Sequence, residues 1–487
     1  PRRPRPVQQR GLKDTRMIPA AAFKYLAVFD AGLAILFSIV VISKKRDPAV
    51  TLAWVLGFFF LPVLGVLLYL FFGYQRFRLR RRQTPNPSGR LPSLHAPDAQ
   101  AALPDPLRGV ADLANRLTEY PVTAQNRVEV FTRADDTDTA LTAAIRGARR
   151  HIHMCYYIFE PDSDGIFYRD LLAEKAREGV QVRLLMDAVG SFSVDDDFLA
   201  PLRRAGARVD FFGPFGTIRR PWAFNFRNHR KLTVIDGRVG FLGSQNIGHH
   251  FWRVGSRRIA WRETDVRVEG PAVEELQTVF AEDWHFVTRE NLTGDDFFPP
   301  PSPDAAGTTL VQALPTGPDR KEDALAFIFV EALHTARERV TITTPYFIPT
   351  PAVVLALEGA ARRGVRVDLL VPRRTDHPVV TWAGRSYFDE FVESGVRIFE
   401  YAEAFLHSKV VTVDGRLALL GSANMDTRSF RINFELSLLV YDEKVVGQLV
   451  DTFDKTAGQS VAVSARPARA PVRHFAEGLC RVLSPLL

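Results

Sequence analysis

One segment of this 487-residue chain occurs twice, and this duplication limits the possible folds more than any other feature. The stretch Arg177–Met186 reappears as Arg362–Val371, and the segment that begins at Asn228 reappears from Leu406, so both repeats are displaced by roughly 180 positions. Two copies of so long a unit are too few for a solenoid, which stacks many short repeats. The duplication therefore predicts two similar domains facing each other about a pseudo-twofold axis, with a pocket between them that receives one motif from each.

The pattern inside each repeat favours an α/β fold. Helical periodicity, as in Thr139–Arg149, alternates with short β-branched runs such as Leu232–Ile235. Alternation of this kind is typical of α/β domains. We therefore expect a mixed β-sheet flanked by helices in each domain, and we place the two domains at residues 126–300 and 301–487. Residues 83–125 are rich in Pro and Ala and are predicted to be a linker with one short helix.

Both repeats contain the pattern H-x-K-x4-D-x6-G-S-x-N. Its residues are His229, Lys231, Asp236, Gly243, Ser244 and Asn246 in the first copy, and His407, Lys409, Asp414, Gly421, Ser422 and Asn424 in the second. On a β-strand, a His and a Lys two positions apart point to the same face. The turn at Asp-Gly returns the chain in a second strand, which ends at the Ser and the Asn. The pattern predicts a face with two imidazoles, two ammonium groups and several neutral hydrogen-bond donors.

These groups together suit a phosphodiester substrate. The ammonium groups of Lys231 and Lys409 can bind the non-bridging oxygens as negative charge develops in the reaction. Further phosphate-binding candidates are Ser244, Asn246, Ser422 and Asn424. One imidazole can attack phosphorus to form a phosphohistidine while the other protonates the leaving oxygen. Such chemistry requires no metal ion and no cofactor, and we predict none.

The two longest apolar runs, Tyr25–Ser43 and Ala49–Gln75, lie near the N-terminus. Each is long enough to cross about 30 Å of hydrocarbon at about 1.5 Å per helical residue. Residues 1–82 are therefore predicted to form a two-helix transmembrane hairpin with basic flanks. The outer flanks carry many more Lys and Arg residues than the connecting loop, which places both termini and the catalytic domains on the cytoplasmic side of the inner membrane.

The net charge of +8 does not indicate a nucleic-acid-binding protein. Residues 1–82 hold fifteen Lys or Arg against three Asp, so the rest of the chain is slightly acidic. A non-specific nucleic-acid binder needs a basic excess on the binding domain, and we therefore expect no nucleic-acid partner. The two cysteines, Cys155 and Cys480, lie far apart and exclude a disulfide scaffold and a zinc finger.

The paired pattern resembles the phospholipase D superfamily, in which it is known as the HKD motif. The hairpin sequence, the stretch from Tyr156 to Asp162 and the C-terminal Leu-Ser-Pro-Leu-Leu resemble the bacterial cardiolipin synthases in particular. The resemblance implies that two phosphatidylglycerols are condensed to cardiolipin and glycerol at an anionic phospholipid membrane. It leaves the oligomeric state open, with a homodimer as one possibility.

The same resemblance implies roles for individual residues. His229 is expected to be the nucleophile, and His407 the acid and then the base. The carboxylates that partner the two imidazoles are expected to be Asp265 and Glu435. The motif residues Asp236 and Asp414 are expected to support the site without touching phosphate.

An aromatic segment precedes the first motif and is a candidate lipid entrance. Its residues are Phe211, Phe212, Phe215, Arg219, Arg220 and Trp222. Aromatic rings together with Arg suit the interface of an anionic bilayer. The alternative is that the rings are buried in the core of a loop.

Two other functions are consistent with the sequence. A membrane-anchored phospholipase D would use the same phosphohistidine and resolve it with water, giving phosphatidic acid. A non-catalytic membrane scaffold would use the cleft only to bind lipid headgroups. The intact His, Lys, Ser and Asn in both copies favour an enzyme over the scaffold.

Overall fold

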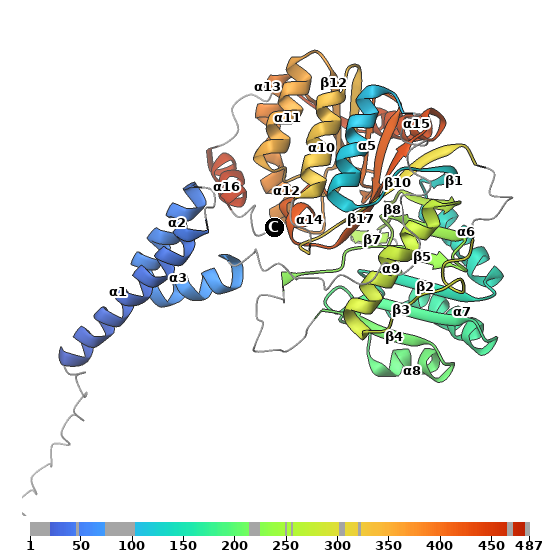
Figure 1. Cartoon of the computed structure of the whole chain (residues 1–487). Helices are drawn as coiled ribbons and strands as arrows, with labels where there is room; N and C mark the ends of the chain where they lie inside the picture. Colours follow the sequence, from blue (N-terminus) through green and yellow to red (C-terminus); the bar gives the residue numbers. More distant parts are fainter. Residues whose placement is uncertain are drawn as a thin grey trace, which may run out of the picture. The chain divides into compact units, whose positions relative to one another are not determined.

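The computed structural model describes residues 20–44, 48–73, 103–213, 225–248, 251–254, 257–300, 307–319, 323–464 and 471–482. The chain divides into two compact units, residues 1–75 and residues 76–487 (Figure 1). Each unit is described separately below.

The N-terminal unit is a small helical hairpin. It contains α1 (Ala20–Ser43), α2 (Pro48–Phe60), α3 (Pro62–Leu68) and the π-helical turn η1 (Tyr69–Gly73). The second predicted span is therefore not continuous, because Pro62 lacks a backbone N–H and the chain bends at Leu61. Phe58 and Tyr69 are fully buried and meet edge to face, with ring centroids 5.4 Å apart. Among the described helices, none combines the length and the apolar character that a membrane crossing requires.

The second unit is built on one mixed sheet of fifteen strands, in the order β18-β13-β12-β11-β15-β16-β17-β10-β1-β9-β6-β5-β2-β3-β4. The first half of the chain supplies β1 (Thr123–Phe131), β2 (His151–Tyr156), β3 (Gln181–Asp187), β4 (Arg208–Phe212), β5 (Leu232–Ile235), β6 (Val239–Gly243) and β9 (Asp265–Glu269). The second half supplies β10 (Thr309–Thr316), β11 (Arg339–Thr343), β12 (Arg366–Pro372), β13 (Arg397–Tyr401), β15 (Val410–Val413), β16 (Leu417–Gly421), β17 (Glu435–Tyr441) and the edge strand β18 (Val461–Val463).

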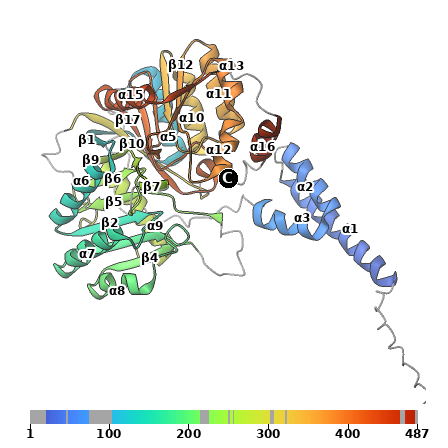
Figure 2. The same cartoon turned by 180° about the vertical axis from the view of Figure 1, so that it is seen from behind.

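This strand order is nearly a palindrome about the antiparallel pair β1 and β10. Each half runs outward from that pair through equivalent strands, so the two sequence repeats are related by a pseudo-twofold axis. The prediction of a mixed α/β fold is confirmed. The two halves differ from separate domains in that they share one continuous sheet and lie side by side (Figures 1 and 2).

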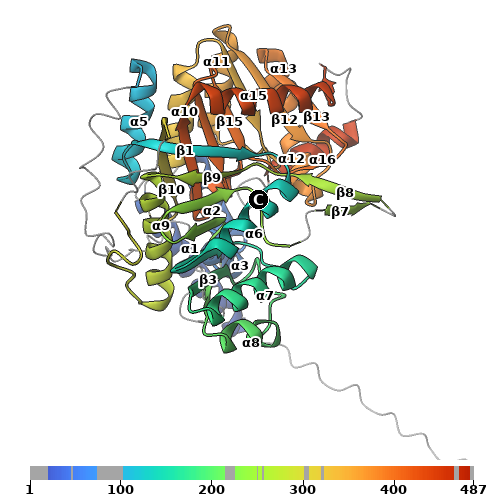
Figure 3. The same ribbon diagram turned by 90° about the vertical axis from the view of Figure 1, so that its right-hand side faces the viewer.

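Helices cover both faces of the sheet (Figure 3). The helices of this unit are α5 (Asp105–Thr118), α6 (Ala134–Gly147), α7 (Ser163–Arg177), α8 (Asp196–Arg204), α9 (Ala272–Thr288), α10 (Ala324–Thr335), α11 (Pro351–Arg362), α12 (Pro378–Arg385), α13 (Phe388–Ser394), α14 (Thr427–Arg431), α15 (Glu443–Gly458) and α16 (Pro471–Val482), of which α16 packs against α12. A second sheet of three strands joins the halves: β7 (Phe251–Val254) and β8 (Arg257–Arg262) belong to the first half, and β14 (Phe405–Leu406) to the second.

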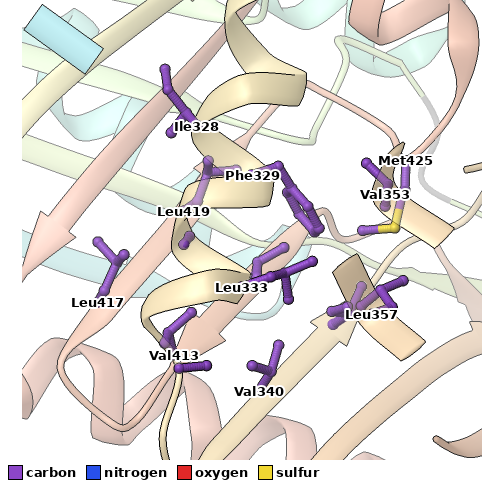
Figure 4. Packing of buried hydrophobic residues seen from close by; sticks show 14 of the residues in the cluster. Ile328, Phe329, Leu333, Val340, Val353, Leu357, Val413, Leu417, Leu419 and Met425 are labelled. Carbon is purple, nitrogen blue, oxygen red and sulfur yellow. The ribbon is translucent and has the colours of Figure 1, made fainter. Parts of the chain in front are cut away.

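The core of the second half lies between its sheet and α10 and α11. Figure 4 shows Phe329 and Leu333 of α10 packed beside Leu357 of α11 and above strand residues such as Val340 and Leu419. Burial of an aliphatic or aromatic side chain of this size contributes about 1.5–3 kcal/mol.

Helix α5 is part of this core although the sequence assigned it to a linker. Its residues Leu107, Val110, Ala111 and Ala114 are buried in the same cluster. Their spacing places them on one stripe of the helix, which therefore packs on α10. Helix α5 is thus a structural element of the second half, whereas β1 of the first half already begins at Thr123. Residues 83–102 lie outside the described part of the chain.

Candidate active site

The two motif histidines are held where the two halves of the second unit meet. The backbone N–H of His229 donates to the carbonyl of Phe434 at 2.9 Å, and that of His407 donates to the carbonyl of Arg262 at 2.8 Å. Each histidine is therefore fixed by the backbone of the opposite half. Burial is the main cause that lowers the pKa of both histidines, and the positive charge of Lys409 adds to this at His229, as that of Lys231 does at His407. Each imidazole therefore feels the lysine of the other motif, and both motifs contribute to one site.

The imidazole–carboxylate pairs also cross between the halves. His229 Nδ1 lies 3.0 Å from the carboxylate of Glu435, and His407 Nδ1 lies 2.9 Å from the carboxylate of Glu263. All four side chains are buried. An Nδ1–H donated to a carboxylate leaves the Nε2 lone pair of each ring available for reaction with a substrate.

The prediction of Asp265 as an imidazole partner is wrong. Its Oδ1 accepts from the backbone N–H of Gln245 at 3.1 Å, and its Oδ2 accepts from Thr137 Oγ1 at 3.4 Å. The sheet register explains the error: Gly243 pairs with Asp265, whereas the equivalent Gly421 pairs with Ser437. Asp265 is thus the counterpart of Ser437 in the second half. The residue two positions before Asp265 is Glu263, and the residue two positions before Ser437 is Glu435.

The motif serines bind these carboxylates. Ser244 Oγ donates to Glu263 Oε2 at 2.6 Å, and Ser422 Oγ donates to Glu435 Oε2 at 2.5 Å. A hydroxyl has one proton to donate, so neither serine donates to a phosphate in this arrangement. In this arrangement both serines orient the carboxylates, and phosphate binding by Ser244 and Ser422 stays a prediction.

The motif lysines stand two positions after the histidines in sequence, and both lysines and both motif asparagines are buried. Nζ of Lys231 donates to the carbonyl of His229 at 2.8 Å, and Nζ of Lys409 donates to the carbonyl of His407 at 2.6 Å. Each ammonium group keeps further protons for an anionic ligand. Asn246 Oδ1 accepts from the backbone N–H of Ile158 at 3.2 Å, so its amide nitrogen is the group with protons to offer.

Burial sets the charge state of the site. It lowers the pKa of His229 and of His407 to about 4, so both rings are neutral at pH 7. Burial and the charge of Lys409 lower the pKa of Lys231 to about 7, and burial lowers that of Lys409 to about 8. Burial opposes ionisation of Glu435, but His229, Lys231 and Ser422 outweigh it and keep the pKa of Glu435 below its usual value.

Asp236 and Asp414 lie away from the imidazoles and hold strand ends. Asp236 accepts from the backbone N–H groups of Arg149, Arg150 and His151, at the start of β2. Asp414 accepts from three equivalent groups, those of Arg337, Glu338 and Arg339, at the start of β11. Both aspartates have a positive φ, 54° and 50°, in the turn before the next strand. Their contacts are those of residues that support the site.

Several residues of the site carried no distinctive signal in the sequence. Ser429 Oγ and Asn433 Nδ2 donate to Glu435 Oε1 at 2.8 and 3.3 Å. Both lie close to Glu435 in sequence, but the first repeat has no counterpart of this segment that would mark them. The ring of Tyr157 meets the imidazole of His229 edge to face, with ring centroids 4.8 Å apart. The ring centroids of Trp261 and His407 are 4.9 Å apart. Both aromatic rings therefore pack against an imidazole of the site.

Of the predicted lipid entrance, the structure describes Phe211 and Phe212, and these two rings do not form an entrance. Phe212 is 3% exposed and packs against Phe286 and Phe434, so it belongs to the core. Phe211 packs, partly buried, against the core of the first half. The rings end a strand of the sheet, which was the alternative interpretation. The residues Phe215, Arg219, Arg220 and Trp222 lie outside the described residues.

Within the described ranges, the His, Cys, Asp and Glu side chains form no group of three or more that could hold a metal ion. The polar groups that meet at the site are two neutral imidazoles, two carboxylates and two ammonium groups. This arrangement can perform nucleophilic attack and acid–base transfer on an anionic substrate with its own side chains.

Comparison with known proteins gives a consistent result. The family described as "Cardiolipin synthase, PLD-like domain" matches residues 141–284 and 329–457, and the family "Phospholipase_D-nuclease N-terminal" matches residues 32–73. A cardiolipin synthase of Geobacillus kaustophilus is 37% identical over 483 residues, which cover 95% of each chain. Cardiolipin synthase 2 of Bacillus anthracis is 36% identical over 476 residues, covering 93% of this chain and 90% of that protein.

Among solved structures, the phosphatidylserine synthase of Haemophilus influenzae shares the fold. Its TM-score is 0.55 at 15% identity, and the match covers 77% of this chain and 97% of that one. The crossed pairs of the two HKD motifs, the family match over both halves and the identity along nearly the whole chain agree, and the chain belongs to the cardiolipin synthase family with phospholipase D-like domains.

Proposed function

We propose that this protein is a cardiolipin synthase, which transfers a phosphatidyl group from one phosphatidylglycerol to another and releases glycerol. The observation that carries the proposal is the pair of crossed contacts between His229 and Glu435 and between His407 and Glu263. Two neutral imidazoles with equivalent carboxylate partners suit a reaction of two successive displacements at phosphorus, in which one imidazole is the nucleophile and the other transfers the proton. The similarity to cardiolipin synthases over nearly the full chain supports the substrate.

In the first displacement, Nε2 of His229 attacks phosphorus and forms a P–N bond. The P–O bond to the headgroup glycerol breaks, and His407 gives its Nε2 proton to the departing oxygen. Binding of the phosphodiester anion favours the imidazolium form of His407 that this step requires. The order of the two histidines rests on the resemblance to the superfamily.

In the second displacement, His407 acts as the base. A headgroup hydroxyl of the second phosphatidylglycerol gives its proton to Nε2 of His407 and attacks phosphorus, and the P–N bond to His229 breaks. Cardiolipin results, and both imidazoles return to their initial states. We assign the stabilisation of the additional negative charge on the phosphoryl oxygens to Lys231, Lys409, Asn246 and Asn424, all of which are buried residues of the two motifs.

We further propose that the N-terminal hairpin anchors the chain in the cytoplasmic membrane, with both termini and the catalytic unit on the cytoplasmic side. Large apolar side chains of its helices face outward, for example Val28, Phe29 and Phe60, which are 72%, 59% and 79% exposed. The basic flanks of residues 1–82 support the orientation. Labelling of single cysteines placed in the flanks and in the 45–47 loop, from either side of sealed vesicles, tests the topology.

The function is tested with the purified full chain in detergent, supplied with phosphatidylglycerol and no nucleotide. We expect cardiolipin and glycerol in equal amounts, undiminished by a chelator, and no product from the His229→Ala variant. Phosphatidic acid as the main product would identify a hydrolase. The absence of either product from a folded protein would identify a lipid-binding scaffold.

A further inference from the structure

Helix α16 presents its apolar side to solvent. Phe475, Leu479 and Val482 are 72%, 55% and 75% exposed, and Gly478 is exposed between them. These residues lie at i, i+3, i+4 and i+7, so they form one continuous stripe along the helix. An amphipathic helix of a water-soluble domain normally buries such a stripe against the core.

The polar side of α16 is the side that contacts the protein. Glu477 is only 2% exposed. The Arg481 guanidinium lies 4.1 Å above the Tyr387 ring and 3.3 Å from the Glu390 carboxylate, and Glu390 belongs to α13. The helix therefore packs with its polar face against the protein and its apolar face outward, which is the reverse of the usual arrangement. This attachment fixes the orientation of the apolar stripe, because rotation of α16 would break the contacts of Glu477 and Arg481.

The charge around the stripe indicates what covers it. Residues 464–482 contain four Arg and one Glu. Helix α12, which packs against α16, adds Trp382 and Val379, each about two-fifths exposed (41% and 42%). An apolar stripe, an exposed Trp and a surplus of Arg are the features of a helix that lies in the interface of an anionic bilayer. A second copy of the chain would bring the same surplus of Arg against itself.

We propose that α16 is a membrane-docking helix, which inserts Phe475, Leu479 and Val482 into the headgroup and acyl boundary of an anionic membrane. The contact forms a second attachment, besides the N-terminal hairpin, and it fixes the second half of the catalytic unit against the lipid surface. The proposal concerns binding to the bilayer and is independent of the chemistry of the two histidines.

The test uses the full chain with Cys480 replaced by Ser, while the 1%-exposed Cys155 stays in place. A fluorescent label is attached at Phe475→Cys or at Leu479→Cys. The control label is at Lys444→Cys, an exposed position on α15, which lies on the far side of the same half from α16 (Figures 1 and 2). The proteins are reconstituted in vesicles of equal phosphatidylglycerol and phosphatidylcholine that contain a nitroxide-labelled lipid, and aqueous iodide is the second quencher.

We expect the nitroxide lipid to quench the labels at 475 and 479 at least threefold more than the label at 444, and iodide to quench them less. In vesicles of phosphatidylcholine alone, this difference should fall severalfold. Free access of iodide to the two stripe positions would overturn the proposal. Protection from both quenchers would also overturn it, because it would show that protein covers the stripe.

A second experiment replaces the apolar side chains of the α16 stripe with polar ones. Replacing Phe475, Leu479 and Val482 by Ser should lower cardiolipin formation severalfold in vesicles with a low fraction of phosphatidylglycerol, and leave it unchanged in mixed detergent micelles. Equal losses in both assays would indicate a folding defect or a role in the core, against the proposal.

Discussion

His229 and Glu435 lie 206 positions apart in the chain and share a hydrogen bond of 3.0 Å between the imidazole Nδ1 and the carboxylate. The equivalent bond joins His407 to Glu263 across 144 positions. Each histidine of the site therefore takes its tautomer and its orientation from the opposite half of the unit.

Glu263→Gln should reduce kcat by roughly 100- to 10,000-fold, because an amide partner no longer fixes the Nδ1–H tautomer or stabilises the imidazolium of His407. The matched variant is Asp265→Asn. Burial and the neighbouring charge of Glu263 raise the pKa of Asp265 to about 8, so a neutral amide resembles its state at pH 7. We expect less than about a tenfold loss for Asp265→Asn, measured as initial rates of cardiolipin formation. Reversed sensitivities would restore Asp265 as the imidazole partner.

Ser422→Ala should lower kcat by about 10- to 100-fold while KM stays nearly constant. Its hydroxyl donates to Glu435 at 2.5 Å, so its removal loosens the carboxylate that positions His229. A serine that binds substrate phosphate would instead affect KM. Steady-state kinetics on mixed micelles separate the two roles, with Ser244→Ala as the parallel variant for Glu263. A raised KM at unchanged kcat would contradict the positioning role.

The pH dependence of kcat/KM should show a loss of activity above about pH 7–8. Anion binding needs the ammonium forms of Lys231 and Lys409, whose pKa values are lowered to about 7 and about 8. His229 becomes protonated only near pH 4, so the nucleophile is available throughout the neutral range. The profile is measured from pH 4 to 10 at low phosphatidylglycerol. Full activity up to pH 10 would show that the lysines keep their ordinary pKa values.

Lys409→Met should cost roughly 100- to 1,000-fold in rate without lowering the melting temperature. The pKa of Lys409 in the folded protein, about 8, lies below its ordinary value of 10.5, so the buried charge opposes folding below pH 8 and this effect disappears as the pH approaches 10.5. The variant should therefore be stabilised relative to the parent more at pH 6 than at pH 9. Thermal unfolding at both pH values checks the sign. A large loss of stability at pH 6 would mean that the ammonium group is a net stabiliser.

Asp236→Ala should destabilise the second unit by about 2–4 kcal/mol, because three backbone N–H groups at the start of β2 lose their acceptor. It also places Ala at a positive φ, which Asn tolerates better. Asp236→Asn should therefore cost less than half as much. Chemical denaturation measures the two variants, and activity per folded molecule should stay within about threefold of the parent. A selective loss of kcat in the fully folded variant would instead place Asp236 in the chemistry.

The sequence alone predicted the parts of this protein that depend on local order. The alternation of helical stretches with short β-branched runs predicted an α/β fold. The spacing of His229 and Lys231 predicted that both side chains lie on one face of an extended segment. The duplication predicted the pseudo-twofold arrangement, because equivalent segments fold in equivalent ways. The family resemblance and the cardiolipin synthase function read from the same residues are confirmed by the comparisons.

The tertiary structure decided which residues meet across the halves. Alternation along a strand gives the face of each side chain but not the register between strands, so the sequence did not separate Glu263 from Asp265. In the structure Asp265 pairs with Gly243, and Glu263, two positions earlier, reaches His407. The packing of α5 on α10 and the burial of Phe212 were decided in the same way, by surfaces distant in sequence. The two repeats join in one sheet because β1 pairs with β10, and this long-range pairing brings each histidine to the carboxylate of the other half.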